Sequence, residues 1–293
     1  LQKEAAKIVK QVNKEIAKKI GINQAARCTC VKPEGTASCI LGTSSGIHPH
    51  HAKRYIRRVQ ANKMEDIYRY FHSINPRACE ESVWSANDTD DVISFCVEVP
   101  AGSKTKNQIS AIELLKSVKS TQQNWVIGGT NKSLCTQPWL VHNVSNTINV
   151  TSEEWDEVEE FIYDNRKWFC GISLLPVTGD KDYPQAPFTA IYLPSKIISH
   201  YGDGAIFVGG LIEVALKLWE DNLWAACDSI LGIGSKPKGE AKREWVKRCK
   251  KFSDKYFNSE VKNLTYCMKD VYNYKLWTEL KREYVDVDFK NVI

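Results

Sequence analysis

The sequence predicts an α/β protein with a helical C-terminal region. Apolar residues recur at three- and four-residue spacing over residues 1–20, which is typical of one face of a helix. Short β-prone runs follow at 25–31 and at 92–99, the second stopped by Pro100. From residue 207 onward helical spacing returns. A helix, a strand, a loop and a helix in this order favour an α/β domain whose strand ends carry ligands.

Composition bounds the class of protein. The chain has 293 residues, of which 43% are apolar and 26% charged, as in a soluble globular protein with one large or two smaller domains. The net charge of +5 is too small over this length to imply nucleic acid, although it suits a protein that handles polyphosphates. No apolar run approaches the roughly 18 residues of a membrane span, and the N-terminus is not a signal peptide. We therefore expect a cytoplasmic protein with no membrane partner.

The cysteines do not form a recognisable framework. There are 10, irregularly spaced and without a Cys-x-x-Cys pair, so neither a zinc ribbon nor a secreted disulfide scaffold is indicated. We expect most of them to be reduced and buried. Cys28 and Cys30 would point to the same face of a strand at 25–31, which leaves a redox role as the minor alternative.

A loop that could hold an anion follows the first predicted strand. Gly35 lets the backbone turn tightly, and Thr36 and Ser38 offer hydroxyl donors. A helix beginning near Thr36 would aim its free N–H groups at the same spot. The alternative is a turn that caps an ordinary helix. The candidate phosphate-binding residues are Pro33, Glu34, Gly35, Thr36, Ala37 and Ser38.

Histidines and arginines follow this loop. His48, His50 and His51 do not predict a metal site, because Pro49 interrupts helical spacing and no carboxylate or Cys lies at ligand spacing. Arginines 54, 57 and 58 would share a face if they lay on a helix. That face would either contact phosphate or be solvated and salt-bridged.

The middle of the chain alternates helix and strand signals. We expect a helix over 109–128 and a strand over 142–150, followed by a helix whose acidic first turn is capped by Thr151 or Ser152. A buried strand over 171–176 then leads into a Thr-Gly-Asp loop at 178–180. Such a loop at a strand end is equally compatible with a ligand site and with a plain turn.

The last hundred residues are expected to be helical. An apolar helix is predicted over 207–227 and a Gly/Lys/Pro-rich linker over 232–239. Residues 240–284 are basic and rich in aromatics, which could stack on nucleic-acid bases. Because these aromatics mostly keep helical spacing, we favour helices that pack them against the main body.

Several blocks together resemble one enzyme family. The blocks are residues 32–58, Val141–Ile148, Asn165-Arg166, Gly171–Pro176, Gly179-Asp180 and Tyr183–Phe188. They resemble adenosylcobalamin-dependent (class II) ribonucleotide reductase. The resemblance is closest to the monomeric, triphosphate-reducing type of some bacteria and their phages. The blocks stand in the expected order over 28–188, and the resemblance weakens from residue 194.

The resemblance implies a fold and a set of site residues. Residues 1–193 would be the C-terminal half of the ten-stranded reductase α/β barrel, and 194–293 a helical, aromatic-rich region. Residues 33–38 would bind the phosphates of a ribonucleoside triphosphate. Residues near adenosylcobalamin would be Asn143, Ser173, Leu174, Leu175, Pro176, Gln185, Ala186, Pro187 and Phe188. The intact enzyme would make 2′-deoxyribonucleotides by thiyl-radical chemistry, with thioredoxin or a similar dithiol as reductant.

Parts of the family's machinery are missing from this sequence. The family's finger loop reads Asn-x-Cys-x-Glu and precedes the phosphate loop, whereas Asn75, Cys79 and Glu80 have another spacing and follow it. We therefore expect Cys79 to be structural, and we assign no catalytic residue and no metal ligand. With no Cys-x-x-x-x-Cys tail either, we expect a C-terminal fragment that does not turn over alone. The alternatives are the non-catalytic, nucleotide- or cobalamin-binding half of a split reductase, and a basic nucleic-acid-binding protein.

Overall fold

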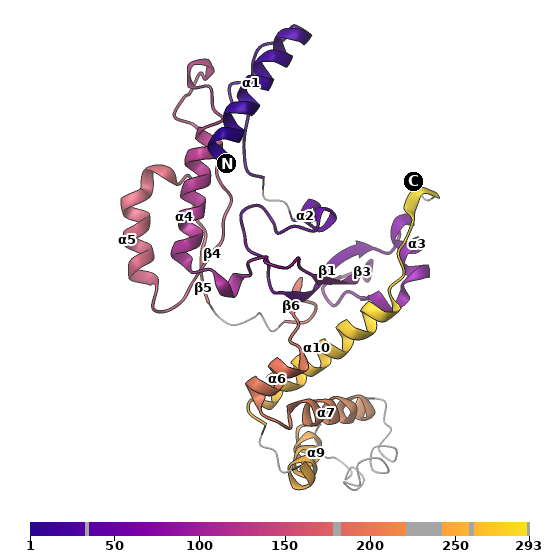
Figure 1. Ribbon diagram of the computed structural model, residues 1–293. Helices are drawn as coiled ribbons and strands as arrows, with labels where there is room; N and C mark the ends of the chain where they lie inside the picture. The colour runs from indigo at the N-terminus through magenta and orange to yellow at the C-terminus, as the bar shows by residue number, and fades with distance from the viewer. Residues whose placement is uncertain (33–34, 178–182, 221–241, 258–260, 292–293) are drawn as a thin grey trace. The chain divides into compact units, whose positions relative to one another are not determined.

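The computed structural model describes residues 1–32, 35–177, 183–220, 242–257 and 261–291 (Figure 1). The chain divides into two compact units, one of Leu1–Lys53 and Val99–Lys181 and one of Arg54–Glu98 and Asp182–Ile293. The boundary expected at 193/194 lies inside the second unit, where α6 begins. Both units mix helices with short strands, as the predicted α/β class requires. In the described part of the chain no helix is long and apolar enough to cross a membrane.

The first unit begins with the predicted N-terminal helix. Helix α1 spans Gln2–Ile20 and ends at Gly21, whose φ of 73° lies in the left-handed region that glycine adopts freely. Only Ala6 and Ala17 of this helix are buried. Its large apolar residues Ile8, Val12, Ile16 and Ile20 are exposed. The helix was therefore predicted correctly, but its apolar stripe does not build the core of this unit.

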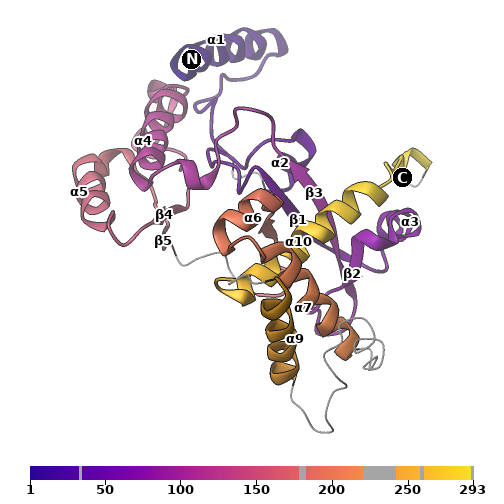
Figure 2. The same ribbon diagram turned by 60° about the horizontal axis from the view of Figure 1, so that its bottom comes forward.

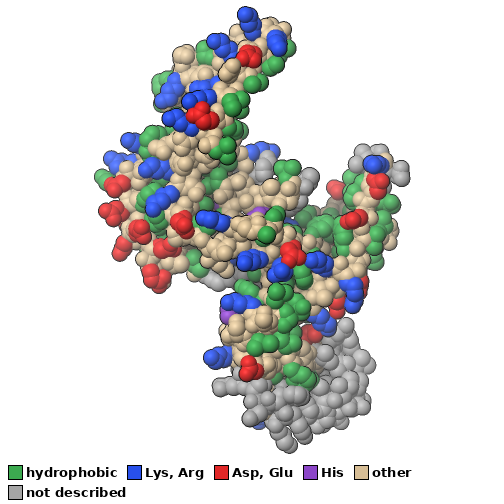
Figure 3. Space-filling view, in the orientation of Figure 1, with side chains coloured by type: hydrophobic (Ala, Val, Ile, Leu, Met, Phe, Trp, Pro, Cys, Tyr) green, Lys and Arg blue, Asp and Glu red, His purple; other side chains and the backbone are tan. Residues whose placement is uncertain are grey.

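A βαβ arrangement forms the body of the first unit. Strands β4 (Ile148–Val150) and β5 (Leu174–Pro176) pair in parallel, and α5 (Trp155–Asn165) connects them. Helix α4 (Ala111–Thr121) begins at a capping box and continues as a π-helix over Gln122–Ile127, so the predicted helix at 109–128 changes its hydrogen-bond pattern near its end. Acidic side chains cover the exposed face of α5 (Figure 3). The buried core comprises Ala111, Ile112, Leu114, Leu115, Val118, Val126, Val144, Ile148, Val150 and Val158.

The strand predicted over 25–31 is wrong. This segment makes one isolated bridge, between Arg27 and Thr130, and otherwise runs as irregular backbone. Regular pairing does not extend because the two segments crowd together at Gly129. A Cβ atom at that glycine would lie 1.8 Å from Oγ1 of Thr29. The β-prone run at 25–31 therefore forms an extended segment without regular strand pairing.

Two other strand predictions were too long, and one cap was misplaced. Of 142–150 only the last three residues pair, and of 171–176 only the last three, which are half-buried or exposed rather than buried. Among the earlier residues, the backbone groups of His142, Val144, Gly171 and Ser173 bond to side chains. Helix α5 begins after Glu154, which stands at the cap position expected for Thr151 or Ser152 but makes no side-chain bond to its own helix. Its carboxylate accepts hydrogen bonds from the backbone N–H groups of Thr151 and Ala111 instead.

An antiparallel sheet anchors the second unit. Strands β2 (Cys79–Glu81), β3 (Asp90–Glu98), β1 (Arg54–Asn62) and β6 (Phe188–Ala190) lie in the order β2-β3-β1-β6. Strand β3 confirms the prediction at 92–99. The helical placement of arginines 54, 57 and 58 is wrong, because β1 pairs along its whole length with β3, from Arg54 opposite Glu98 to Asn62 opposite Asp90. Helix α3 (Asp66–Ile74) contributes Tyr68 and Phe71 to the core below the sheet.

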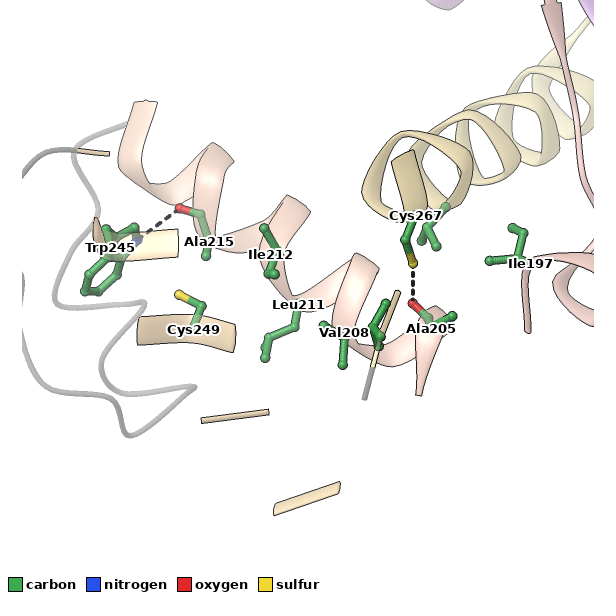
Figure 4. Close-up of a cluster of buried hydrophobic side chains, with 11 residues drawn as sticks. Ile197, Ala205, Val208, Leu211, Ile212, Ala215, Trp245, Cys249 and Cys267 are labelled. Atoms are coloured by element: carbon green, nitrogen blue, oxygen red, sulfur yellow. Dashed lines mark hydrogen bonds between the residues drawn. The ribbon is translucent and has the colours of Figure 1, made fainter. Parts of the chain in front are cut away.

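In its described residues, four helices complete the second unit. They are α6 (Pro194–Tyr201), α7 (Ala205–Glu220), α9 (Lys242–Phe257) and α10 (Leu264–Glu283), and Figure 2 shows them from the side on which they come forward. Fully buried Trp245 donates its indole N–H to the carbonyl of Ala215 at 3.4 Å (Figure 4). Trp277 of α10 is buried in the core under the sheet. The expectation that helices pack these aromatics is therefore confirmed for Trp245 and Trp277, and the linker expected at 232–239 lies outside the described residues.

The ten-stranded barrel is not confirmed. In the described residues the sheets are one of four strands, all antiparallel, and one of two parallel strands. The barrel was expected from the resemblance, and closing a sheet into a barrel needs a continuous ring of paired strands. The helical C-terminal region is present as expected.

Candidate functional site

The predicted phosphate loop leads into a short helix. Helix α2 spans Thr36–Leu41 and begins where the sequence predicted, while Pro33 and Glu34 lie outside the described residues. The buried hydroxyl of Ser38 donates to the carbonyl of Gly35 at 2.8 Å. The backbone carbonyl of Ser38 accepts from Thr43 N–H at 3.0 Å. Ser38 therefore holds the turn of the loop together in this conformation.

His48 ties the segment after this loop to a distant part of the first unit. Its Nδ1 donates to the carbonyl of Ser45 at 2.9 Å, and its Nε2 accepts from the backbone N–H of Thr147 at 2.9 Å. The two partners assign the tautomer, since a carbonyl can only accept and an N–H can only donate. Both ring nitrogens are therefore used in structure. In the described ranges no group of three or more His, Cys, Asp or Glu side chains could hold a metal ion.

Buried Asn146 connects two segments of the first unit, one around Val144 and one around Gly171. Its Nδ2 donates to the carbonyls of Val144 at 2.8 Å and Gly171 at 2.9 Å, and its Oδ1 accepts from Ser173 N–H at 3.3 Å. Asn143 differs, because its side chain is exposed and lies against Gly171. Of the two asparagines that stood out in the sequence, Asn146 is structural and Asn143 has its amide available.

A polar cavity of about 530 Å³ lies beside these residues in the first unit. It is lined by Ser44, Ile47, His48, Pro49, His50, Ser103, Lys104, Ile109, Glu113, Lys116 and Ser117. The Glu113 carboxylate is occupied by the Ser110 N–H in the capping box of α4. The cavity thus offers two lysines, Lys104 and Lys116, and several serine hydroxyls, of which only that of Ser44 is close in sequence to α2; this lining suits an anionic ligand.

A second cavity, of about 540 Å³, lies in the second unit. Arg58 and Gln60 stand on one face of β1, since they are two residues apart on a strand. Gln60 lies opposite Val92 of β3. The remaining wall residues come from two loops and are Ser82, Trp84, Tyr183, Gln185 and Pro187. The sequence had selected Gln185 and Pro187 as cofactor-proximal, and the structure places both at this cavity.

The two loops of this cavity are joined by three hydrogen bonds. The Gln185 side chain accepts from Val83 N–H at 2.9 Å and donates to the carbonyl of Glu81 at 2.7 Å. The Trp84 indole donates to the carbonyl of Pro184 at 3.0 Å. Gln185 has a φ of 56°, a left-handed conformation that is uncommon for a residue with a side chain. Its two side-chain bonds fix that conformation, so the cavity wall is held in one shape.

Arg58 places a buried charge in the same cavity. Its guanidinium donates to the carbonyl of Ala186 at 3.2 Å and to the hydroxyl of Thr189 at 2.6 Å, and its Nε lies 3.8 Å from the Glu80 carboxylate. Only 10% of the Arg58 side chain is exposed, against 53% for Glu80. Burial lowers the pKa of Arg58, and Glu80 partly offsets this. Of the other two arginines, Arg54 pairs with Glu98 at 2.7 Å and Arg57 lies over the Phe188 ring at 4.1 Å.

The family-like stretch around Cys79 is structural in its contacts. The Asn75 side chain makes two hydrogen bonds to the backbone of Val285, at 2.8 and 2.9 Å. The Cys79 thiol donates to the carbonyl of Asn75 at 3.6 Å, and burial raises its pKa. A thiol whose pKa is raised is a poor nucleophile near neutral pH. These contacts fit the expected structural role of Cys79.

Sequence reasoning missed the residues that shape the second cavity. Trp84, Gln60 and Ser82 belong to no motif, and the loops that meet here are about one hundred residues apart along the chain. Two signals could have indicated them. One is a tryptophan within a polar loop, and the other is the spacing of Arg58 and Gln60, which places both on one face of a strand. The second of these was missed because only helical spacing was considered for that segment.

Several curated proteins are similar in sequence to this mixed α/β chain. An adenosylcobalamin-dependent ribonucleoside-triphosphate reductase of Lactobacillus delbrueckii subsp. bulgaricus is 28% identical over 189 residues, which cover 62% of this chain and 23% of that protein. Proteins of the same name from Lactobacillus acidophilus and Levilactobacillus brevis are each 26% identical, over 62% and 61% of this chain and 23% and 22% of theirs. No protein-family model matches.

One solved structure is also similar. It is a crystal structure of a B12-dependent (class II) ribonucleotide reductase, with a TM-score of 0.48 and 21% identity over 66% of this chain and 26% of that chain. The sequence matches confirm the resemblance on which the motif analysis rested. The chain is related to adenosylcobalamin-dependent ribonucleoside-triphosphate reductases over about 62% of its length, and it spans about a quarter of the length of those relatives.

Proposed function

We propose that this chain is the C-terminal portion of an adenosylcobalamin-dependent ribonucleotide reductase that converts ribonucleoside triphosphates to 2′-deoxyribonucleotides. The observation that carries the proposal is the sequence relationship to reductases of that name over 62% of the chain. In the intact cytoplasmic enzyme of this proposal, the two sheets would belong to the ten-stranded barrel, thiyl-radical chemistry would use a cysteine outside this chain, and a thioredoxin or similar dithiol would return electrons.

Residues 33–38 would bind the substrate phosphates. The support is local: α2 starts at Thr36, and the lysine-bearing cavity of the first unit begins at Ser44, shortly after that helix. Backbone N–H groups, hydroxyls and lysines are the groups that proteins use for phosphates. A triphosphate bound here would be held by side chains of this chain, none of which we assign as catalytic.

In each unit, taken by itself, the residues expected near adenosylcobalamin have side chains that suit such a group. A corrin has extended apolar faces and a rim of amide side chains. Leu175 and Phe188 expose 42% and 40% of their surface, and the exposed Asn143 amide can bond to such a rim. Ser173, Leu174 and Pro176 adjoin Leu175, and Gln185, Ala186 and Pro187 precede Phe188. When bound, the cofactor would supply the radical chemistry, while these residues would only hold and shield it.

The proposal is tested by assaying turnover of the protein encoded by the full reading frame that contains this chain. With adenosylcobalamin, a ribonucleoside triphosphate and a dithiol, the full reading frame is expected to yield deoxynucleotide, and the 293-residue chain alone is expected to yield none. Absence of product from the full frame, purified folded and with cofactor bound, would refute the proposal. Product from the chain alone would refute the expectation that it is inactive.

The phosphate loop can be tested by binding to the chain itself. We expect Thr36→Val to weaken ribonucleoside-triphosphate binding, measured by titration calorimetry, because it removes a hydroxyl from the loop. Thr43→Val is the matched control, since Thr43 lies just past α2 and its backbone N–H makes the local contact. Equal affinities for both variants would place the phosphates elsewhere. The split-reductase alternative predicts co-purification with a chain that bears a Cys finger loop.

A further inference from the structure

We propose that the cavity of the second unit lined by Arg58, Trp84 and Tyr183 binds a nucleotide, with the base against the aromatic rings and the phosphate toward the guanidinium. The choice of a nucleotide over another aromatic anion rests on the proposed function. The residues that line the cavity indicate, by themselves, an aromatic and anionic ligand. No residue of this cavity belongs to the phosphate loop, so the site is additional to that loop, while Gln185 and Pro187 are also among the residues expected near adenosylcobalamin.

The aromatic wall consists of two exposed rings at a right-angled corner. The Trp84 and Tyr183 ring centroids are 6.0 Å apart, with an interplanar angle of 77°. Trp84 is 59% exposed and Tyr183 is 39% exposed. Large aromatic side chains usually bury more of their surface than this. Rings left open at a cavity wall favour a planar ligand that stacks on them, and such stacking tolerates any base.

The wall is rigid enough to hold a ligand. Trp84 is fixed by its indole hydrogen bond to Pro184, and the two loops are further joined through the Gln185 amide. Below them, Pro187 is tied to the sheet because its carbonyl accepts the Arg58 N–H at 2.9 Å. The strained φ of Gln185 is kept by these contacts. Fixed walls reduce the ordering cost that a ligand must offset on binding.

The anionic preference comes from Arg58. Among the described residues that line this cavity it is the one charged side chain, and it is nine-tenths buried. The Glu80 carboxylate compensates it at 3.8 Å, beyond hydrogen-bond distance, and within the described structure Nε has no hydrogen-bond partner. A buried cation with such loose compensation attracts a further anion. A phosphate in the cavity would supply one, beside the Gln60 amide and the Ser82 hydroxyl.

Two sources share this chemistry. A free nucleotide carries a heteroaromatic base and a phosphate, and so does the nucleotide tail of a cobalamin. Cobinamide lacks this tail. The cavity volume of about 540 Å³ is within the ~300–1,000 Å³ of small-molecule sites and accommodates either. The cavity therefore indicates a ligand with a heteroaromatic base and a phosphate. A competition experiment distinguishes a free nucleotide from the cobalamin tail.

The test is calorimetric titration of the whole chain with AMP, adenosine and inorganic phosphate. We expect AMP to bind roughly tenfold more tightly than adenosine, because a charge-assisted contact is gained. Trp84→Ala is expected to weaken AMP binding roughly fivefold or more through lost stacking. Trp139→Ala, which removes a 74% exposed tryptophan of the first unit, is the matched control. Equal loss in both variants, or AMP binding no tighter than adenosine, would overturn the proposal.

A gain-of-affinity variant separates the site from any effect of misfolding. Glu80→Gln removes the carboxylate that competes for Arg58, so AMP should bind more tightly while adenosine binding stays the same. Unchanged AMP affinity in this variant would overturn the role of Arg58. Displacement of AMP by cobalamin but not by cobinamide would assign the site to the cobalamin tail, and displacement by neither would assign it to a free nucleotide.

The outcomes also distinguish this inference from the proposed function. AMP binding that depends on Trp84, in a protein whose full reading frame makes no deoxynucleotide, would refute the proposed function and leave this site standing. Deoxynucleotide formation together with no measurable AMP binding at millimolar concentration would do the reverse.

Discussion

Replacing Asn146 by alanine is expected to destabilise the first unit because this buried residue hydrogen-bonds to the backbone of two neighbouring segments. The change removes hydrogen bonds of 2.8, 2.9 and 3.3 Å, to Val144, Gly171 and Ser173. Each is worth about 0.5–1.5 kcal/mol net. Gly171 and Ser173 are exposed, so water can take up their freed backbone groups. The expected loss in the free energy of unfolding is therefore ~2–3 kcal/mol, toward the lower part of the summed range.

Asn143→Ala is the matched control for this experiment. Asn143 lies three residues away and is exposed, so its removal should change the free energy of unfolding by less than ~0.5 kcal/mol. Urea unfolding followed by circular dichroism measures both variants, and hydrogen exchange at residues 144–150 checks that the loss is local. A loss below ~1 kcal/mol for Asn146→Ala, or equal losses in the two variants, would refute this role of Asn146.

Three further predictions follow from single contacts. Burial alone would raise the pKa of Glu154, but hydrogen bonds from two backbone N–H groups outweigh it and lower that pKa. The ionised carboxylate therefore stabilises the fold at pH values above 4.5, the ordinary pKa of a Glu side chain. In thermal melts, the advantage over Glu154→Gln should disappear as the pH falls below 4.5 and through the lowered pKa. Gly129→Ala should lower Tm, since its Cβ would lie 1.8 Å from Oγ1 of buried Thr29 and overpacking costs ~1–3 kcal/mol; an unchanged Tm would mean that the segments separate freely. Burial raises the pKa of Cys267 to about 11, so iodoacetamide at pH 8 should modify exposed Cys30 well before Cys267, as mass spectrometry can determine; equal labelling would contradict that burial.

The Asn146 and Asn143 pair also bears on the proposed function. If Asn143 contacts a corrin amide, Asn143→Ala should weaken cobalamin binding while leaving the unfolding curve in place. Asn146→Ala would instead move the unfolding curve first. The two readouts separate a residue that touches a ligand from one that positions the backbone around it.

Local signals in the sequence were sufficient where one segment satisfied its own backbone. Helix α1 was predicted with its end at Gly21, and α2 with its start at Thr36, because helical spacing and a left-handed glycine are local properties. Strand β3 was predicted for a similar reason, since its run of β-prone residues stops at a proline.

The sequence misled where a distant partner decided the structure. Arg54, Arg57 and Arg58 have a spacing that fits a helix, yet they lie on β1 because β3 and β6 offer backbone partners on both sides. Glu154 stands at the cap position of α5, and its carboxylate accepts the first N–H of another helix, α4. Neither partner can be inferred from spacing within one segment.

By itself, the sequence determined the α/β class, the helical C-terminal region and the relationship to cobalamin-dependent reductases, because periodicity and motif order are carried by neighbouring residues. Only the tertiary structure decided which of these residues share a site. It joined His48 to Thr147, assigned Asn146 to the scaffold, and built one cavity from Arg58, Trp84 and Gln185. The physical reason is that hydrogen bonds and burial between segments about one hundred residues apart have no signature in either segment alone.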